Sequence, residues 1–186
     1  MNTRVKGFIY LLLSAVYFGF MPLLVKVICA DGSAIVGALF LRFALAIIPL
    51  YIYLKVRKVP IELSVEEGKK ILCVTVFGYG ITALLLYSAY DYMPSGMATV
   101  IHFGYPVFVL LGSLIFLRRR VPKLKIVCVG LCMIGIFLSY AGSGGEAKPM
   151  GFVFALISGM TYAFYILYLE VGGLQDIPAM KMIFYM

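Results

Sequence analysis

Three side chains that carry or can gain a positive charge lie inside strongly apolar stretches of the sequence: Lys26, Arg42 and His102. Burying a charge in the middle of a bilayer costs about 2.5 to 3.5 kcal/mol on insertion scales, so such residues commonly have a function. The stretches contain no Asp or Glu apart from Glu170 at the edge of one of them. At about 1.5 Å per helical residue, Arg42 lies roughly 12 Å and His102 roughly 9 Å below one boundary. Together with Lys26 they predict a layer that attracts a carboxylate or phosphate on a solute.

Structural roles compete with this interpretation for each side chain. Lys26 is near the end of its stretch and could extend its ammonium group to the headgroups. Arg42 could donate hydrogen bonds to loop carbonyls, to Asp31 or to Asp91. His102 is the only side chain of the sequence with an ordinary pKa near neutrality, which would suit proton coupling. A core histidine bonded to a backbone carbonyl is the commoner case, and the sequence leaves both roles open.

Tyrosines and serines near the middle of the apolar stretches form a second group of candidates. Gly104-Tyr105-Pro106 should interrupt a helix beside His102, because proline removes a helical hydrogen bond and glycine removes packing bulk. Such a break would direct Tyr105 and freed carbonyl groups inward. Ordinary interhelical packing is the alternative for each tyrosine. We predict an aromatic, hydroxyl-lined cavity whose candidate residues are Ser14, Tyr17, Tyr79, His102, Tyr105, Ser158 and Tyr162.

Other kinds of chemistry are weakly represented. The segment Gly78-Tyr79-Gly80-Ile81-Thr82-Ala83 fits a dinucleotide-binding pattern, but it lies within an apolar stretch and lacks the strand and helix that this pattern needs. One histidine and four dispersed cysteines make no metal site. Neither a Ser-His-Asp set nor a phosphate-binding loop is visible. The sequence therefore predicts no catalytic residue, no metal and no cofactor, and it argues against an enzyme.

The elements that must position these residues are six apolar stretches, each near the ~20 residues that span a hydrocarbon core of about 30 Å as a helix. The chain of 186 residues is 63% hydrophobic and 13% charged, with a mean hydropathy of +1.05, whereas soluble domains have about 25% charged residues. We predict an all-α integral membrane protein, a polytopic helical bundle in the lipid bilayer. The stretches run from Gly7 to Ile28, Ala34 to Leu54, Ile71 to Tyr90, Gly96 to Leu117, Ile126 to Gly142 and Met150 to Leu169.

A seventh apolar stretch opens near Ala179 and contains eight residues up to Met186. Eight helical residues rise about 12 Å and do not cross a bilayer. We therefore expect a fragment, a truncated reading frame or a protein whose last helix is re-entrant. The first stretch is longer than the apolar region of a signal peptide and has no clear cleavage site, so we expect it to be a mature helix.

Positive charges concentrate in alternate loops. Of the sixteen Lys and Arg residues, two precede the first stretch, five follow the second and five follow the fourth, while the opposite loops contain Lys148 alone. Basic loops stay in the cytoplasm, so we expect a multi-pass protein of the plasma membrane, which is the inner membrane in many bacteria, with a cytoplasmic N-terminus. The net charge of +8 thus predicts membrane loops rather than nucleic-acid binding. In the second of these loops, Ser64 and Glu67 have the spacing of a capping box and predict a helix start near Val65.

An internal repeat is visible when the sequence is shifted by 144 positions. The segment Gly7 to Ser14 then aligns with Gly151 to Ser158, with identical Gly, Phe, Leu and Ser residues. Small residues continue both segments, since Ala15 and Gly19 fall opposite Gly159 and Ala163. Small residues spaced by four suit close helix packing in membranes.

The two copies would cross the membrane in opposite directions, because they are the first and the sixth predicted helices. Inverted repeats of this kind are typical of carriers with alternating access and a binding site near the midplane. We therefore divide the chain into a first repeat at residues 1–142, an outer linker at 143–149 and the beginning of a second repeat at 150–186.

Several short motifs follow in a characteristic order: Leu41-Arg42-Phe43, Tyr87-Ser88-Ala89, Tyr105-Pro106-Val107-Phe108-Val109, Phe116-Leu117, Gly130 and Gly135. In these motifs the sequence resembles the EamA branch of the drug/metabolite transporter superfamily, ten-helix carriers built from two five-helix repeats. The resemblance implies a structural role for Arg42, because the family has this arginine with many substrates. The family usually has Gly-Glu-Arg after the fourth helix, where this chain has Arg118-Arg119-Arg120. This departure implies the loss of any salt bridge that the glutamate makes in relatives.

Residues and resemblance together predict a secondary transporter for a small metabolite, with a preference for an anionic or zwitterionic solute such as an amino acid. Rocking of the two repeats would give alternating access. One alternative is a membrane fragment or assembly partner that does not transport by itself. Another is a membrane-embedded lipid-modifying enzyme, for which only Asp91 with His102, or Glu66 with Glu67, approach a suitable cluster. The expected partners are the solute and the bilayer, without nucleic acid, and a homodimer stays open.

Overall fold

The structure is a computed structural model that describes residues 3–28, 35–119, 121–142 and 148–186. These residues form helices and no strand. The helices are α1 (Thr3–Ile28), α2 (Ile35–Val56), α3 (Val65–Cys73), the π-helix η1 (Val74–Gly80), α4 (Ile81–Ala89), α5 (Ser95–His102), α6 (Tyr105–Ile115), α7 (Lys123–Ala141), α8 (Pro149–Val171) and α9 (Ala179–Tyr185).

Five helical segments of the described chain are long and apolar enough to cross a membrane. They are Gly37–Val56, Val65–Ala89, Ser95–Ile115, Lys123–Ala141 and Pro149–Val171. The corresponding apolar part of α1, Val5–Met21, is shorter. The predicted helical membrane bundle is therefore confirmed, with five spans in the described residues where the sequence predicted six and the beginning of a seventh.

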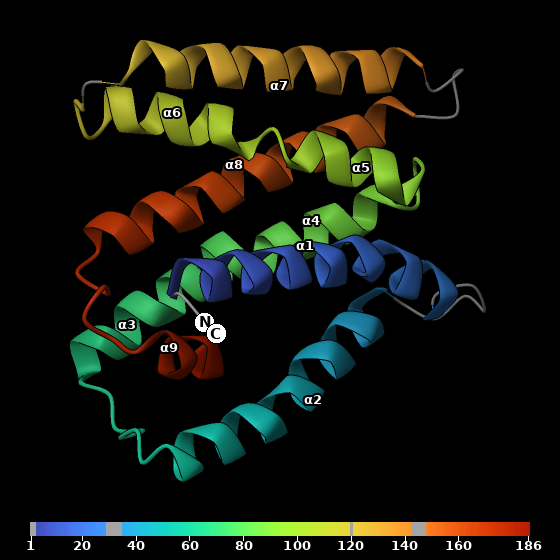
Figure 1. The fold of residues 1–186 in the computed structure, drawn as a ribbon. Coiled ribbons are helices and arrows are strands. Elements are labelled where there is room, and N and C mark those ends of the chain that lie inside the picture. Colours follow the sequence, from blue (N-terminus) through green and yellow to red (C-terminus); the bar gives the residue numbers. More distant parts are fainter. Residues whose placement is uncertain (1–2, 29–34, 120, 143–147) are drawn as a thin grey trace.

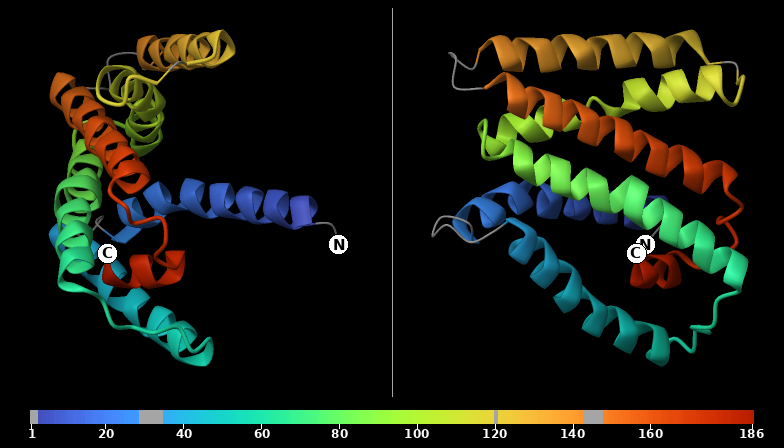
Figure 2. Two further views of the ribbon diagram at one scale, coloured as in Figure 1. Left: turned by 90° about the vertical axis from the view of Figure 1, so that its left-hand side faces the viewer. Right: turned by 180° about the vertical axis from the view of Figure 1, so that it is seen from behind.

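Most helices lie side by side in one curved layer, in the order α7, α5 with α6, α8, α3 with η1 and α4, and α2 (Figure 1). Seen along the layer, α1 and α9 lie on its concave side (Figure 2). The central helix is α8, which packs against η1, α4, α5 and α6. Residues far apart in the sequence can therefore meet around α8 on the concave side.

Small residues let α8 approach its neighbours closely. Gly159 and Ala163 are buried in α8, and a methyl group on Gly159 would lie 3.2 Å from the carbonyl oxygen of His102. The equivalent residues of the other predicted copy, Ala15 and Gly19, do not make such close contacts. Both are exposed in α1, and Gly19 has no neighbour within 4 Å of its ideal Cβ position.

The third span begins with the predicted capping box, which the structure confirms. The Ser64 hydroxyl accepts a hydrogen bond from the backbone N–H of Glu67 at 3.2 Å, and the Glu67 carboxylate accepts one from the backbone N–H of Ser64 at 2.9 Å. Together these contacts satisfy two backbone donors that a helix start leaves unpaired.

The same span contains a full π-helix between α3 and α4, which the sequence did not predict. Its Gly78 faces α8, where an ideal Cβ would lie 2.9 Å from the Cβ atom of Tyr165. The hydroxyl of Thr82 donates to the carbonyl oxygen of Gly78. Short π-helical segments inside α-helices are frequent at functional sites.

The fourth span is interrupted where Gly104-Tyr105-Pro106 predicted a break. Helix α5 ends at His102 and α6 begins at Tyr105, with Pro106 in its first turn. Proline is well tolerated in that turn because its missing N–H would have no helical partner there. The break places His102 at a helix end beside α8.

The close contact at Gly78 leads to a testable expectation for stability. Gly78→Ala should lower the free energy of unfolding by about 1 to 3 kcal/mol, because the added methyl group overpacks the contact with Tyr165. Gly68→Ala in α3 is the matched control, since its ideal Cβ position has no neighbour within 4 Å and alanine favours helix more than glycine. Thermal unfolding in detergent would measure both variants. Equal unfolding temperatures for the two would contradict the close approach of η1 and α8.

Candidate functional site

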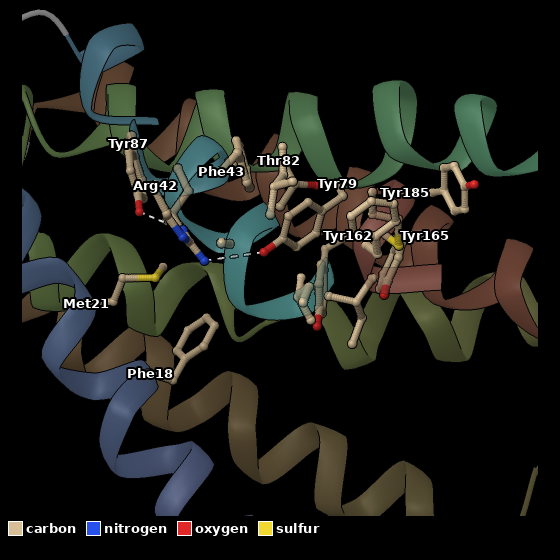
Figure 3. Close-up of a pocket in the computed structure, with 18 of the residues that line it drawn as sticks. Phe18, Met21, Arg42, Phe43, Tyr79, Thr82, Tyr87, Tyr162, Tyr165 and Tyr185 are labelled. Atoms are coloured by element: carbon tan, nitrogen blue, oxygen red, sulfur yellow. Dashed lines mark hydrogen bonds between the residues drawn. The ribbon is translucent and has the colours of Figure 1, made fainter. Parts of the chain in front are cut away.

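A cavity of about 660 Å³ lies between α1, α2, η1 with α4, α8 and α9 (Figure 3). Its volume is in the range of about 300 to 1,000 Å³ that is usual for small-molecule sites. Apolar and aromatic side chains form most of the lining, while Arg42 is the one permanently charged side chain among the described residues that line it. Such a lining suits a small solute with a few polar atoms.

Two tyrosine hydroxyls hold the guanidinium group of Arg42 at the cavity (Figure 3). Its Nη1 atom donates to the Tyr87 hydroxyl at 2.7 Å and its Nη2 atom donates to the Tyr79 hydroxyl at 3.3 Å. The guanidinium carbon also lies 5.6 Å from the centre of the Phe43 ring. Asp91 is not among the partners of Arg42, and Asp31 lies outside the described residues. Two neutral hydroxyls therefore orient the cation without cancelling its charge.

Four tyrosines form a continuous row beside this cation, and we call Tyr79, Tyr165, Tyr162 and Tyr105 the tyrosine row. Neighbouring ring centres in this order are 6.0, 5.4 and 4.8 Å apart. These separations fall in the range of about 4.5 to 7 Å in which aromatic pairs attract one another. Because Tyr79 also binds Arg42, the row joins the charged part of the cavity to an aromatic surface.

His102 and Ser158 form a buried pair at the break between α5 and α6. Their Nδ1 and Oγ atoms are 2.9 Å apart, and the Ser158 hydroxyl donates to the carbonyl oxygen of Ala155 at 2.6 Å. A serine hydroxyl has one hydrogen to donate, so Ser158 must accept from Nδ1–H of His102. The Nδ1 atom of His102 therefore carries the hydrogen of this contact. His102 is 2% exposed and lines the cavity.

The other candidates from the sequence are distributed differently around the cavity. Ser14 and Tyr162 line it together with Arg42, Tyr79 and His102. Tyr105 and Ser158 contact the lining residues Tyr162 and His102 without lining the cavity themselves, and Tyr17 is 75% exposed on α1. The side chain of Lys26 lies outside the described part of the chain. The cavity thus brings five candidates together, and their roles in binding stay predictions.

Sequence reasoning did not identify four polar residues that line the cavity: Thr82, Tyr87, Tyr165 and Tyr185. Tyr165 follows Tyr162 by three residues, and residues at this spacing share a helix face, so the signal was present. The hydroxyl groups of Thr82 and Thr161 are 2.6 Å apart. That contact joins α4 to α8 and was not visible in the spacing of either helix.

Helix α9 forms one wall of the cavity and is fixed to the loop between α2 and α3. The Lys181 ammonium group donates to the carbonyl oxygen of Glu62 at 2.5 Å, and the Tyr185 hydroxyl donates to that of Ile61 at 2.6 Å. An apolar cluster of Ile71, Val74, Leu174 and Ile177 lies beside these contacts. The beginning of the second predicted repeat therefore contacts the first directly.

A further contact between the two parts involves the triple arginine segment. Arg119 forms an exposed ion pair with Glu170 at the end of α8. The resemblance implied that a salt bridge is lost when arginine replaces glutamate in this segment. The structure shows an ion pair here whose carboxylate comes from α8, although an exposed pair contributes only about 0 to 1 kcal/mol.

The apolar helices define a multi-pass membrane protein, and the described residues enclose a cavity between them. A family model described as the EamA-like transporter family matches residues 5–141. The chain belongs to this family, which confirms the resemblance found in the sequence.

Curated relatives carry similar names. The chain is 23% identical to an uncharacterized transporter of Clostridium kluyveri over 171 residues, which cover 86% of this chain and 54% of the relative. It is 29% identical to an uncharacterized transporter of Archaeoglobus fulgidus over 149 residues, which cover 78% of this chain and 52% of the relative. The chain thus spans about half the length of these relatives. No solved structure matches it.

Proposed function

We propose that this protein is a secondary transporter for a small anionic or zwitterionic metabolite, such as an amino acid. Family membership supports transport and favours it over a lipid-modifying enzyme. The observation that carries the choice of solute is Arg42, whose positive charge is not compensated by the hydroxyl groups that accept its hydrogen bonds. No carboxylate side chain lines the cavity within the described residues. A solute with a carboxylate would supply the missing negative charge.

The proposed mechanism is alternating access between two inverted repeats, with the N-terminus in the cytoplasm. The first repeat would comprise residues 1–142 and the second would begin at 150, after the linker 143–149. Support comes from the match between Gly7 to Ser14 and Gly151 to Ser158. The position of the cavity is also suitable, since both α2 from the first repeat and α8 from the second contribute to its lining. Movement of α8 relative to α2 would then change access to Arg42.

Transport assays can test the proposed solute class. The protein, as its whole gene encodes it, would be reconstituted in lipid vesicles and offered labelled amino acids, organic acids and lipophilic cations. We expect uptake or efflux of at least one amino or organic acid above the level in protein-free vesicles. Transport of lipophilic cations without any amino or organic acid would contradict the proposal.

A further inference from the structure

The charges around the cavity restrict the solute more narrowly than its size does. An anionic solute would neutralise the guanidinium group of Arg42, which always carries its charge. A zwitterion would also bring an ammonium group, and the described residues offer no carboxylate side chain in the lining to pair with it. Burying an unpaired charge is unfavourable in an apolar site. The described lining therefore offers an ionic partner for a negative charge and no carboxylate for a positive one.

Arg42 and Tyr79 together present a set of donors for a carboxylate. A guanidinium group has five N–H donors in a planar fork, and Arg42 uses one on each of Tyr79 and Tyr87. Further N–H groups of this fork stay available for the two oxygens of a carboxylate. The Tyr79 oxygen accepts a hydrogen bond from Arg42. The O–H of Tyr79 can therefore donate to the carboxylate of the same solute.

Next to these donors, the tyrosine row offers aromatic ring faces in fixed positions. Tyr79 packs between Phe43 and Tyr165, with ring centres 5.9 and 6.0 Å away. Tyr162 stacks on Tyr165 with an angle of 27° between the two ring planes. The rings of Tyr105 and Tyr162 meet edge to face at an angle of 74°. In Figure 3 the rings of Tyr79, Tyr162 and Tyr165 lie close together, and Tyr79 is the one bonded to the guanidinium group. A flat aromatic solute gains attraction from such rings beyond the apolar area that it buries.

We propose that the transported solute is an aromatic carboxylate with one negative charge and no ammonium group. This inference rests on the proposed transporter function and narrows its solute class. The carboxylate binds the Arg42 guanidinium and the Tyr79 hydroxyl, and the aromatic ring packs against Tyr162 and Tyr165. Neighbouring residues support this geometry, since the ring centres of His102 and Tyr105 lie 5.3 and 4.8 Å from that of Tyr162.

Three probes of similar size separate the parts of this inference. They are 3-phenylpropanoate, its saturated counterpart 3-cyclohexylpropanoate, and phenylalanine, which adds an ammonium group. Binding to the purified protein, as its whole gene encodes it, would be measured by equilibrium dialysis or calorimetry. We expect 3-phenylpropanoate to bind roughly 2- to 12-fold tighter than the cyclohexyl compound, which corresponds to one aromatic contact. It should bind roughly 5- to 150-fold tighter than phenylalanine, whose ammonium group would be unpaired.

Variants can test whether the preference for the phenyl compound over the cyclohexyl compound depends on the tyrosine row. Tyr162→Leu should remove the preference for the phenyl over the cyclohexyl compound, while Tyr162→Phe should keep it. Phe164→Leu is the matched control, because Phe164 is an aromatic residue of α8 that does not line the cavity. If Tyr162→Leu does not fold, the ranking of the three probes on the unchanged protein decides the question alone.

The outcomes distinguish this inference from the transporter function beneath it. Equal or tighter binding of 3-cyclohexylpropanoate would overturn the aromatic part. Tighter binding of phenylalanine would overturn the monoanion and leave the proposed transport of a zwitterion in place. Transport of another acid without binding of 3-phenylpropanoate would overturn the inference alone. Vesicles that move no amino or organic acid would overturn both.

Discussion

Replacing Arg42 with glutamine is expected to lower the initial rate of solute uptake roughly 10- to 150-fold, because a charge-assisted hydrogen bond contributes about 1.5 to 3 kcal/mol. Glutamine keeps an amide donor that can reach a tyrosine hydroxyl, so the local packing should survive. The measurement is uptake into vesicles that contain equal amounts of folded protein.

Arg57→Gln is the matched control for the loss of one positive charge. Arg57 lies directly after α2, contacts the ring of Tyr53 at 5.7 Å and does not line the cavity. Its uptake rate should stay close to that of the unchanged protein. Unchanged uptake by the Arg42 variant would contradict the binding role, and loss of folded Arg42→Gln protein would assign this arginine to the fold, as the family resemblance implies.

Replacing Ser158 with alanine is expected to lower the free energy of unfolding by about 1 to 3 kcal/mol. The Ser158 side chain is completely buried, and the substitution leaves the Nδ1–H group of His102 without its acceptor. Hydrogen bonds between membrane helices average about 0.6 kcal/mol, so the cost should come mainly from the unpaired histidine. Denaturant or thermal unfolding in detergent would measure it.

Ser139→Ala in α7 is the control for this change, because Ser139 is exposed and surface substitutions usually change stability by less than about 0.5 kcal/mol. A Ser158 variant as stable as the Ser139 variant would contradict the buried pair. His102→Leu combined with Ser158→Ala removes both partners, and it should recover part of the lost stability, since two apolar groups leave no donor unpaired.

Much of the helical architecture could be predicted because apolar length determines where a membrane helix can lie. The fifth stretch was expected from Ile126 to Gly142 and forms α7 at Lys123–Ala141. The sixth was expected from Met150 to Leu169 and forms α8 at Pro149–Val171. Proline and glycine also located the break after His102. These features depend on residues that are close in the sequence, so the sequence alone was sufficient.

Features that depend on contacts between helices could not be predicted in the same way. The π-helix η1 is accompanied by a close approach of Gly78 to Tyr165, which lies in a different span. The partners of Arg42 were expected among loop carbonyls and acidic residues, but they are the hydroxyls of Tyr79 and Tyr87. Side-chain type and position along each apolar stretch predict that such groups lie at a similar depth in the membrane. They do not determine which helices are neighbours within it.

The tyrosine row also gives this protein an intrinsic fluorescence signal close to the cavity. The chain has fourteen tyrosines and no tryptophan, so the phenol rings are the strongest ultraviolet emitters among its residues. Rings as close as Tyr162 and Tyr165 can pass excitation energy to one another. A bound compound that absorbs at the tyrosine emission wavelength would collect this energy, and occupancy of the cavity could then be followed without attaching a dye.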